Sequence, residues 1–376
     1  MPAVTYTLRI GGAPAGPDLL QAIRQIEVED HANMADMLRL RVVIGVGDGC
    51  AGWSFVDDDI FARLTNVRVA VAVGSGRAET LINAYVIETS ATFANQPGAS
   101  VLNVVAMDPT VLMNLEEKVK PWPNMSDSDV ADAVFSSPAY RFRPVVDATR
   151  WRRQENDQTL IQRGTDIQFL QQLARRNGFE VYVETDGLTG VVEGHFHAPR
   201  LELPPQGVLS VNMRDATNVN SFNARFDMLR PSTAQAANLD VETREAQQAQ
   251  VNSSRLEALG RETALAAQRP RRVLLAQTGL VRTGEQQTYA QAVADQSALS
   301  ITAEGELNTV AYGGLLRAKR PVLVRGAGRQ FSGTYYVERV SHVLTPDSYR
   351  QSFSLRRNAV GLSGTESFVA SDALPA

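Results

Sequence analysis

The sequence contains a single cysteine, Cys50, among 376 residues. One thiol excludes an internal disulfide framework and a zinc site built from several cysteines. No stretch approaches the roughly 18 consecutive apolar residues of a membrane-spanning helix. The N-terminal residues also lack the basic segment and apolar run of a signal peptide. We therefore expect a protein that is made in the cytoplasm and is not inserted into a membrane.

A large excess of positive charge is also missing. Lys and Arg number 37 against 41 for Asp and Glu, which gives a formal net charge of -4. This balance argues against a protein that coats DNA, because such proteins neutralise phosphates with clustered basic side chains. Hydrophobic residues make up 44% of the chain, which is enough for a packed core. Because the length exceeds the roughly 250–300 residues at which single cores stop growing, we expect two or more domains.

Alternating apolar residues dominate the first hundred positions. Three runs place an apolar side chain at every second position, the period of a half-buried strand: residues 38–44, 67–73 and 102–106. Segments that contain glycine or proline separate these runs. Several short strands at this spacing predict a mainly β fold, a barrel or a sandwich.

Helix signals appear after residue 110. Thr165 and Gln168 fit a capping box, and Gly178 can end that helix in the left-handed conformation. Ser126 can cap a shorter helix, because Asp127 and Asp129 in its first turn complement the helix dipole. A strand pattern follows Gly178 at once. We interpret residues 111–205 as an inserted α+β domain.

The segment 230–287 is rich in Ala, Gln, Arg and Ser and has few large apolar side chains. We expect a polar, solvated insertion there, with a helix over part of 241–268. A second helix is predicted near 288–299. The chain after Asn358 is rich in Gly, Ser and Ala, which predicts a mobile tail.

An internal repeat is the most informative pattern. The motif Gly-x-Gly-Arg occurs at 74–77 and again at 326–329, each time after an apolar strand. Each copy is followed by Tyr-Val, at Tyr85-Val86 and at Tyr336-Val337. Each then has a proline-containing turn and a closing alternating strand; the two prolines are Pro97 and Pro346. The repeat predicts one strand–turn–strand–turn–strand unit that is used twice. Three such chains around an axis would present six similar units, a pseudo-sixfold ring on a threefold body.

Six stretches carry a family resemblance: Leu81–Val86, Leu102–Asp108, Ser126–Ala131, Thr165–Val183, Arg325–His342 and Tyr349–Arg357. Together they resemble the late control D family of phage tail proteins and the N-terminal hub part of VgrG spikes in type VI secretion. The resemblance covers roughly 1–230 and 288–358.

The resemblance implies a mainly β (α+β) fold with two tube-like β-barrels and an inserted α+β domain. Such chains assemble as trimers with a pseudo-sixfold ring of barrels. We divide the chain into 1–110 as the first barrel, 111–205 as the inserted domain, 206–229 with 288–358 as the second barrel, 230–287 as the polar insertion, and 359–376 as the mobile tail.

The function that the resemblance implies is structural and not enzymatic. The chain would be a homotrimeric baseplate hub that joins the hexameric inner tube to a trimeric spike and contacts other baseplate proteins. The sequence stops soon after the second predicted barrel, so we expect the spike to be a separate polypeptide. The protein would be made in the bacterial cytoplasm and assembled into a virion tail or an injection-system particle. We expect no cofactor and no specific nucleic acid partner.

The sequence leaves the kind of machine and two alternative functions open. The machine can be a phage tail, a secretion system or an extracellular injection particle. Two alternative functions are a tail-associated cell-wall hydrolase and a receptor-binding tail protein.

The candidate metal-binding, phosphate-binding and catalytic residues do not form a complete motif. His195 and His197 share one face of a strand, but a metal site needs a third and usually a fourth ligand. We therefore interpret them as solvated or pore-facing histidines. The glycines of 45–50 precede a loop and not the helix that a phosphate site requires. Glu155 and Asp157 lie in a polar run and lack the apolar pocket that would raise the pKa of a catalytic acid.

A basic stretch with interleaved aromatic residues runs from Tyr140 to Arg153. Such a pattern can contact nucleic acid, but the acidic total favours ion pairing at a subunit interface. We assign no catalytic, cofactor-binding or metal-ligating residue.

Overall fold

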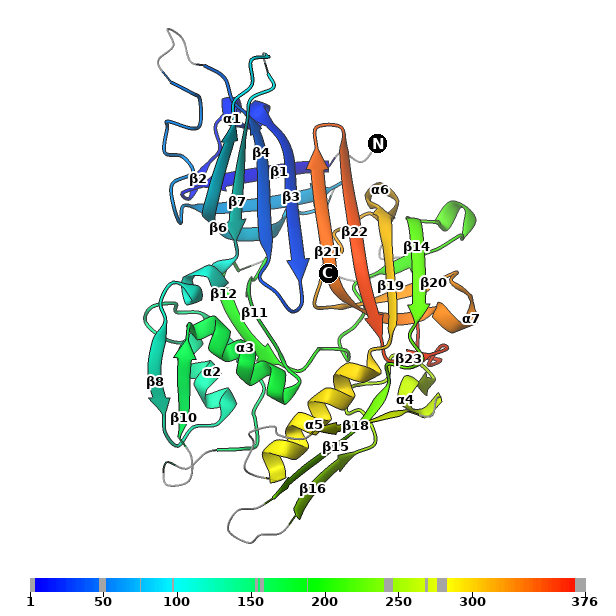
Figure 1. The fold of residues 1–376 in the computed structure, drawn as a ribbon. Coiled ribbons are helices and arrows are strands. Elements are labelled where there is room, and N and C mark those ends of the chain that lie inside the picture. Colours follow the sequence, from blue (N-terminus) through cyan, green and yellow to red (C-terminus); the bar gives the residue numbers. More distant parts are fainter. Residues whose placement is uncertain are drawn as a thin grey trace.

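The fold is mainly β and is described by a computed structural model (Figure 1). The structure describes residues 4–46, 52–74, 76–96, 98–152, 155, 159–187, 189–239, 246–267, 270–275 and 283–368. Thirteen strands belong to one large sheet, which confirms the predicted fold class.

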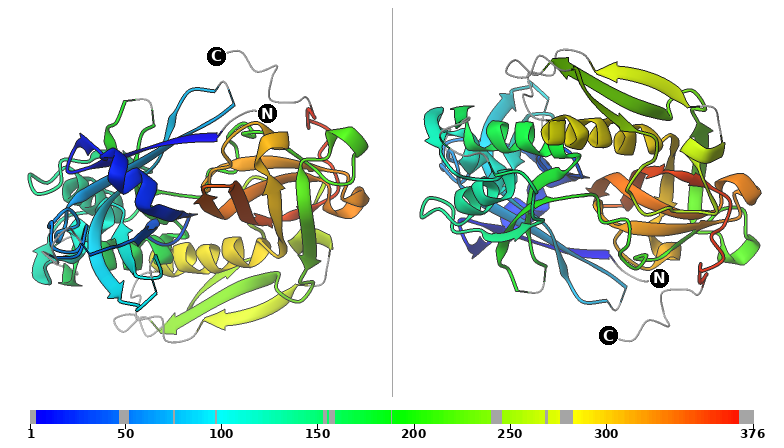
Figure 2. Two further views of the ribbon diagram at one scale, coloured as in Figure 1. Left: turned by 90° about the horizontal axis from the view of Figure 1, so that it is seen from above. Right: turned by 90° about the horizontal axis from the view of Figure 1, so that it is seen from below.

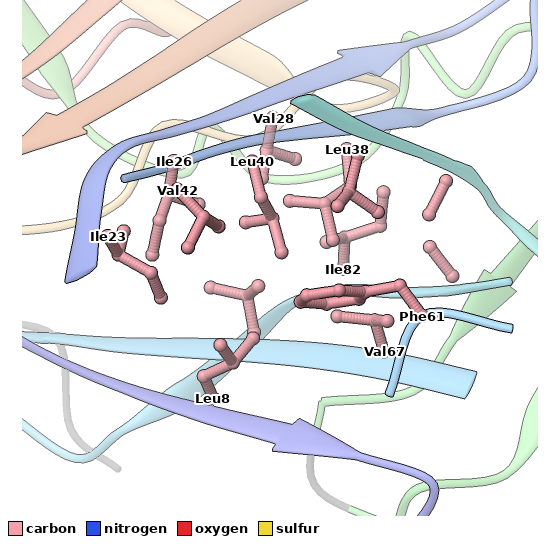
Figure 3. Close-up of a cluster of buried hydrophobic side chains, with 14 of the residues drawn as sticks. Leu8, Ile23, Ile26, Val28, Leu38, Leu40, Val42, Phe61, Val67 and Ile82 are labelled. Carbon is pink, nitrogen blue, oxygen red and sulfur yellow. The ribbon is translucent and has the colours of Figure 1, made fainter. Parts of the chain in front are cut away.

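The first β unit takes up the N-terminal part of the chain. Its strands are β1 (Val4–Ile10), β2 (Ala13–Pro14), β3 (Ile23–His31), β4 (Met37–Val43), β5 (Asn66–Val73), β6 (Glu79–Thr92) and β7 (Val101–Met107), with the short helix α1 (Pro17–Ala22). Alternate side chains of these strands form its core. Figure 3 shows side chains of β3 and β4 facing Leu8 of β1 and Val67 of β5 across this core.

The second β unit comes mostly from the C-terminal part of the chain. Its strands are β13 (Val208–Ser210), β14 (Val219–Phe226), β19 (Ile301–Asn308), β20 (Pro321–Arg325), β21 (Gly333–Thr345) and β22 (Ser348–Arg357). The short helices α6 (Thr309–Tyr312) and α7 (Gly328–Phe331) lie in its connections. It has a hydrophobic core of its own, which includes Leu209, Ile301, Tyr335 and Phe353.

The two β units repeat one strand order. Neighbouring strands run β3-β4-β7-β6-β5-β1 in the first unit and β14-β19-β22-β21-β20-β13 in the second. The two units differ in the direction of the last strand of each order. β1 pairs antiparallel with β5, whereas β13 pairs parallel with β20. Antiparallel pairing of β21 with β3 joins the two units into one sheet.

The repeated motifs occupy equivalent places in the two units. Tyr85 lies on β6 and Tyr336 on β21, and each Tyr-Val pair is followed by a shift in register. The shift falls between Val86 and Glu88 in β6 and between Val337 and Arg339 in β21. This agreement confirms the predicted repeated strand–turn–strand–turn–strand unit, because a bulge is a specific local feature of a strand pair. Of the two prolines in the repeat, Pro97 lies outside the described residues.

Glycine is required at the first turn of each repeat. Gly74 has φ of 63° and Gly326 has φ of 81°, the left-handed region that other side chains rarely adopt. A Cβ atom on Gly326 would also overlap the carbonyl oxygen of Val211. Among the described residues, the strand pairings of the large sheet do not form a closed ring, so closure of either unit into a tube stays a prediction.

A middle segment lies between the β units in the sequence. It contains the helices α2 (Asp127–Phe135) and α3 (Asp166–Asn177), the 3-10 turn at Pro109–Asn114, and the strands β8 (Lys118–Trp122), β9 (Arg143–Val146), β10 (Leu160–Gly164), β11 (Glu180–Thr185) and β12 (Val192–His197). The predicted N-caps Ser126 and Thr165 are both present, and Gly178 ends α3 with φ of 73°. Thr165 forms the predicted capping box, and Ser126 forms one with Asp129 as well. The predicted α+β character of this segment is confirmed; its boundaries stay predictions.

The polar insertion differs from the prediction of a solvated excursion with a helix over 241–268. It holds the strands β15 (Ser232–Leu239), β16 (Ala246–Val251), β17 (Glu262–Thr263) and β18 (Arg271–Leu275), the short helix α4 (Ala264–Ala267) and the helix α5 (Thr283–Ala298). A core of small side chains lies between its sheet and α5; its buried members are Ala234, Ala236, Ala249, Val251, Ala290 and Ala294. Of the helix predicted over part of 241–268, the described residues contain only the short helix α4. Residues 246–251 form a strand instead, with Ala249 and Val251 on its buried face.

The helix predicted near 288–299 is present as α5 and begins earlier, at Thr283. Figure 2 shows α5 beside α3, and Gly178 of α3's end lies against Ala292. The predicted mobile tail begins instead with a paired strand, β23 (Ala359–Val360), which is antiparallel to β17. Residues 369–376 of that tail lie outside the described residues. None of the helices described is long and apolar enough to cross a membrane.

Candidate functional site

Charged side chains are buried at the place where the two β units meet. Lys319 precedes β20, and its Nζ atom donates to Asp30 Oδ1 at 2.7 Å and to Asp36 Oδ2 at 2.9 Å. Lys319 is only 4% exposed and Asp30 only 2%. Arg317 and Asp108 complete the group. We call Asp30, Asp36, Asp108, Arg317 and Lys319 the ionic junction.

Arg317 connects three parts of the chain. Its Nη1 atom donates to the backbone oxygen of Leu81 in β6 at 2.9 Å. Its Nε atom lies 3.4 Å from Asp30 Oδ2 in β3, and its Nη2 atom lies 3.5 Å from Glu184 Oε1 in β11. One guanidinium group of the second β unit thereby contacts the first β unit and the middle segment, as its planar set of five donors permits.

The backbone around the ionic junction holds its carboxylates in place. The backbone amide of Asp36 donates to Asp108 Oδ2 at 2.7 Å, and the backbone amide of Asp108 donates to the backbone carbonyl oxygen of Asp36 at 3.0 Å. The amide of His31 donates to Asp36 Oδ1 at 2.7 Å. Lys319 has φ of 66°, a strained backbone conformation for a residue with a side chain. Such strain persists where surrounding contacts outweigh it, and the two carboxylates supply those contacts.

The buried charges shift one another's protonation. Burial by itself would raise the pKa of Asp30, but the charges of Lys319 and Arg317 outweigh burial and hold this pKa below its usual value. Burial raises the pKa of Asp36 well above its usual value, and Lys319 opposes that rise only in part. Burial also raises the pKa of Asp108. Burial would lower the pKa of Lys319, yet Asp30 and Asp36 raise it. The centre of the junction is therefore the ion pair of Lys319 with Asp30.

A second buried carboxyl group lies beside the ionic junction. Tyr336 of β21 donates its hydroxyl to Glu180 Oε2 of β11 at 2.6 Å. Burial raises the pKa of Glu180 to about 7, although the hydrogen bond from Tyr336 opposes the rise. The ring of Tyr182 lies below Lys319, with Nζ 5.0 Å from the ring centroid. These contacts attach the middle segment to the second β unit.

The structure corrects the interpretation of the histidine pair. His195 and His197 lie on β12 and are mostly buried, so they are not solvated. Their rings share a hydrogen bond of 3.2 Å, and Tyr182 stacks on His195 at 4.4 Å between centroids. Burial, followed by His197, lowers the pKa of His195 to about 3. Among the residues that the structure describes, no group of three or more His, Cys, Asp or Glu side chains is placed to hold a metal ion.

The basic stretch has partners within the chain. Arg143 pairs with Glu193 of β12, and Arg152 Nη2 lies 2.9 Å from Asp129 Oδ2 of α2. These two arginines therefore do not need a neighbouring subunit, and an interface role for the rest of the stretch stays a prediction. Cys50, Asp157 and most of the loop 45–50 lie outside the described residues.

Reasoning from the sequence did not find the ionic junction. Its members come from positions 30 to 319, so no local motif unites them. One signal was present: Asp30 follows Ile26 and Val28 at the spacing of two residues that puts all three side chains on one face of a strand, and that face is buried. A charged residue in that position indicates a partner, because buried carboxylates are rarely left unpaired.

The family comparison finds one model along most of the chain. A family model described as the Alg8 N-terminal domain matches residues 2–346. No curated protein matches the sequence.

Solved tail proteins share the fold along nearly the whole chain. A tail protein from Neisseria meningitidis matches with a TM-score of 0.65 and 12% identity, covering 94% of this chain and 97% of that one. A prophage tail protein from Shewanella oneidensis matches with a TM-score of 0.64 and 15% identity, covering 94% and 98%. An Escherichia coli component of the type VI secretion system, described as structurally similar to bacteriophage tail proteins, matches with a TM-score of 0.57 and 10% identity, covering 96% and 80%.

Replacement of Lys319 by Met tests the ionic junction. We expect the free energy of unfolding to fall by about 3–5 kcal/mol, because the change leaves buried carboxyl groups without their cation. Urea denaturation followed by tryptophan fluorescence measures the loss. Lys120→Met is the matched control, since the Lys120 side chain is exposed, and it should cost less than about 1 kcal/mol. Adding Asp30→Asn to Lys319→Met should recover part of the loss. Equal costs for the two lysine changes would contradict the role of the junction.

Replacement of Glu180 by Gln tests the second carboxyl group. The pKa of Glu180 is about 7 in the folded chain, above the ordinary value of 4.5. The contribution of Glu180 to the free energy of unfolding is therefore fully present only below pH 4.5, where the group is protonated in both the folded and the unfolded chain. That contribution is lost as the pH rises through 7. We expect the Gln variant to gain about 2–3 kcal/mol relative to the native chain between pH 5 and pH 8.5. Glu117→Gln, at an exposed position, should show no such trend. A stability difference for Glu180→Gln that is independent of pH would overturn this assignment.

Proposed function

The chain belongs to the Alg8 N-terminal domain family, and from its fold we propose that it is a structural hub of a contractile tail or injection-system baseplate. The proposed hub is a homotrimer that joins the hexameric inner tube to the spike. Its role is mechanical and needs no catalytic step. The proposed place of action is the particle itself, a virion tail or an injection machine.

The repeated strand order is the observation that carries this proposal. One chain contains two units with the order β3-β4-β7-β6-β5-β1 and β14-β19-β22-β21-β20-β13. Three chains around a threefold axis then supply six similar units. Such a body can face a sixfold tube on one side and a threefold spike on the other. A chain with a single β unit would not resolve this mismatch of symmetry.

The ionic junction supports the same proposal. A ring of six units requires that the two units of one chain keep one orientation, because an error in the angle would be repeated around the axis. Lys319 and Arg317 connect the second β unit to β3 and β6 through buried hydrogen bonds of 2.7 and 2.9 Å, and Arg317 also lies 3.5 Å from Glu184 of β11. Buried ion pairs of this kind favour one geometry, since any displacement leaves charge without a partner.

Unpaired strand edges offer a means of contact between chains. The large sheet ends with β14 on one side and with β1 and β2 on the other (Figure 1). Within the described part of the chain, β14 pairs only with β19, so the backbone groups that alternate residues of β14 direct away from β19 have no strand partner. Unpaired edges are templates for strands of a neighbouring chain.

The mass of the assembled complex tests the proposed function. We expect light scattering on the purified chain mixed with its spike protein to show three copies of the chain per complex. Arg329→Glu, at an exposed position of α7, should weaken this assembly, because we place this turn at the contact between chains. Urea denaturation of the variant should give an unchanged free energy of unfolding, and retained assembly would count against a contact at this turn. The control is Arg63→Glu, an exposed position in the first β unit. Complexes with only one copy of the chain would contradict the proposed trimer.

A further inference from the structure

β18 is an edge strand of the polar insertion, and its outer edge has no partner strand among the described residues. The sheet of this insertion has the order β16-β15-β18, so β15 is paired on both sides and the other two strands lie at the edges. Figure 1 shows α5 along this sheet. In the described part of the chain, β18 pairs only with β15, and the two strands run parallel. The free amide and carbonyl groups of an edge strand can pair with an added strand.

The side chains of β18 give this edge a distinct chemistry. Leu275 packs toward the core beneath α5, whereas Arg272 and Leu274 lie on the opposite face. Leu274 is 63% exposed, which is unusual for a leucine in a strand. Arg271 and Arg272 are both exposed, and among the described residues neither has an ion-pair partner. The edge therefore combines free backbone groups, an exposed aliphatic side chain and two unpaired positive charges.

The opposite edge of the same sheet lacks these properties. β16 presents Gln248 and Gln250 on its exposed face, and neither side chain is charged. Gln248 accepts a hydrogen bond from Gln235, and Gln287 donates to the Gln250 carbonyl oxygen at 3.5 Å. The backbone of Arg271 in β18 also has partners, the carbonyl oxygen of Pro231 and the hydroxyl of Thr233. The two edges therefore differ in side-chain chemistry: β18 carries positive charge and an exposed leucine, whereas the exposed side chains of β16 are neutral amides.

We propose that β18 binds an extended, acidic segment of a partner protein by strand addition. The added strand would pair its backbone with β18 and place a carboxylate opposite Arg272 and an aliphatic side chain opposite Leu274. Opposite charges and apolar pairs directly across two strands stabilise their pairing. On the inner face, the added strand would extend the apolar surface of Leu275 beneath α5. This site lies in the polar insertion, outside both β units, and so goes beyond the proposed hub function.

A peptide probe on the full chain tests the proposal. The probe is a fluorescein-labelled peptide of sequence Glu-Val-Glu-Val-Glu-Leu-Glu, and fluorescence anisotropy measures its binding. We expect saturable binding, and binding at least about tenfold weaker for a peptide with Lys in place of Glu. A peptide with alternate backbone amides N-methylated should also bind at least about tenfold more weakly, because it cannot complete the strand pairing.

Variants of the chain locate the binding. Combined Arg271→Glu and Arg272→Glu should weaken the acidic peptide at least about tenfold. Combined Arg63→Glu and Arg163→Glu is the matched control, with the same change of charge at exposed positions elsewhere. Amide hydrogen exchange should slow in residues 271–275 when the peptide binds. No saturable binding, equal effects of the two double variants, tight binding of the N-methylated peptide, or protection confined to other segments would each overturn the proposal.

Discussion

The arrangement of the two β units depends on one interaction, the contact of the buried Lys319 ammonium group with Asp30 and Asp36. A lysine in a protein interior loses the solvation of its charge, and only close carboxylates offset that loss. Asp30 and Asp36 both lie within 3 Å of its Nζ atom. Both carboxylates belong to the first β unit, whereas Lys319 belongs to the second. Separation of the units would therefore leave a buried charge without its partner. The free-energy cost of that loss favours one orientation of the two units.

This constraint acts together with the backbone pairing of β3 with β21. Strand pairing alone leaves two sheets free to twist relative to one another, because the twist between neighbouring strands varies widely. Arg317 adds contacts to β6 and β11, which lie in different directions from the junction. Tyr336 and Glu180 add another contact between β21 and β11. The second β unit thus has contacts in several directions, and these contacts fix its orientation relative to the first β unit.

The sequence predicted those features whose signals are local. The N-cap at Ser126, the capping box at Thr165 and the glycine turns of the repeat each lie within a few residues, where backbone chemistry alone decides the conformation. The ionic junction could not be predicted, because Asp30 and Lys319 lie 289 residues apart and meet only after the sheet has formed. The sheet of the insertion was missed for another reason. Its core is built from alanines such as Ala234 and Ala290, and their weak hydrophobicity resembles that of a solvated segment. The buried histidines were misread because burial depends on what covers a strand, which the strand's own sequence does not report.

The orientation of the two β units can be measured directly by pulsed electron paramagnetic resonance. Spin labels at Ser90→Cys on β6 and Glu304→Cys on β19 report the distance between the units in a Cys50→Ser background. A single narrow distance distribution is the predicted result for the native junction. Under conditions in which both proteins stay folded, Lys319→Met should broaden or shift that distribution. A narrow and unchanged distribution in the folded Lys319→Met protein would contradict the account, because the units would then hold their orientation without the buried ion pair.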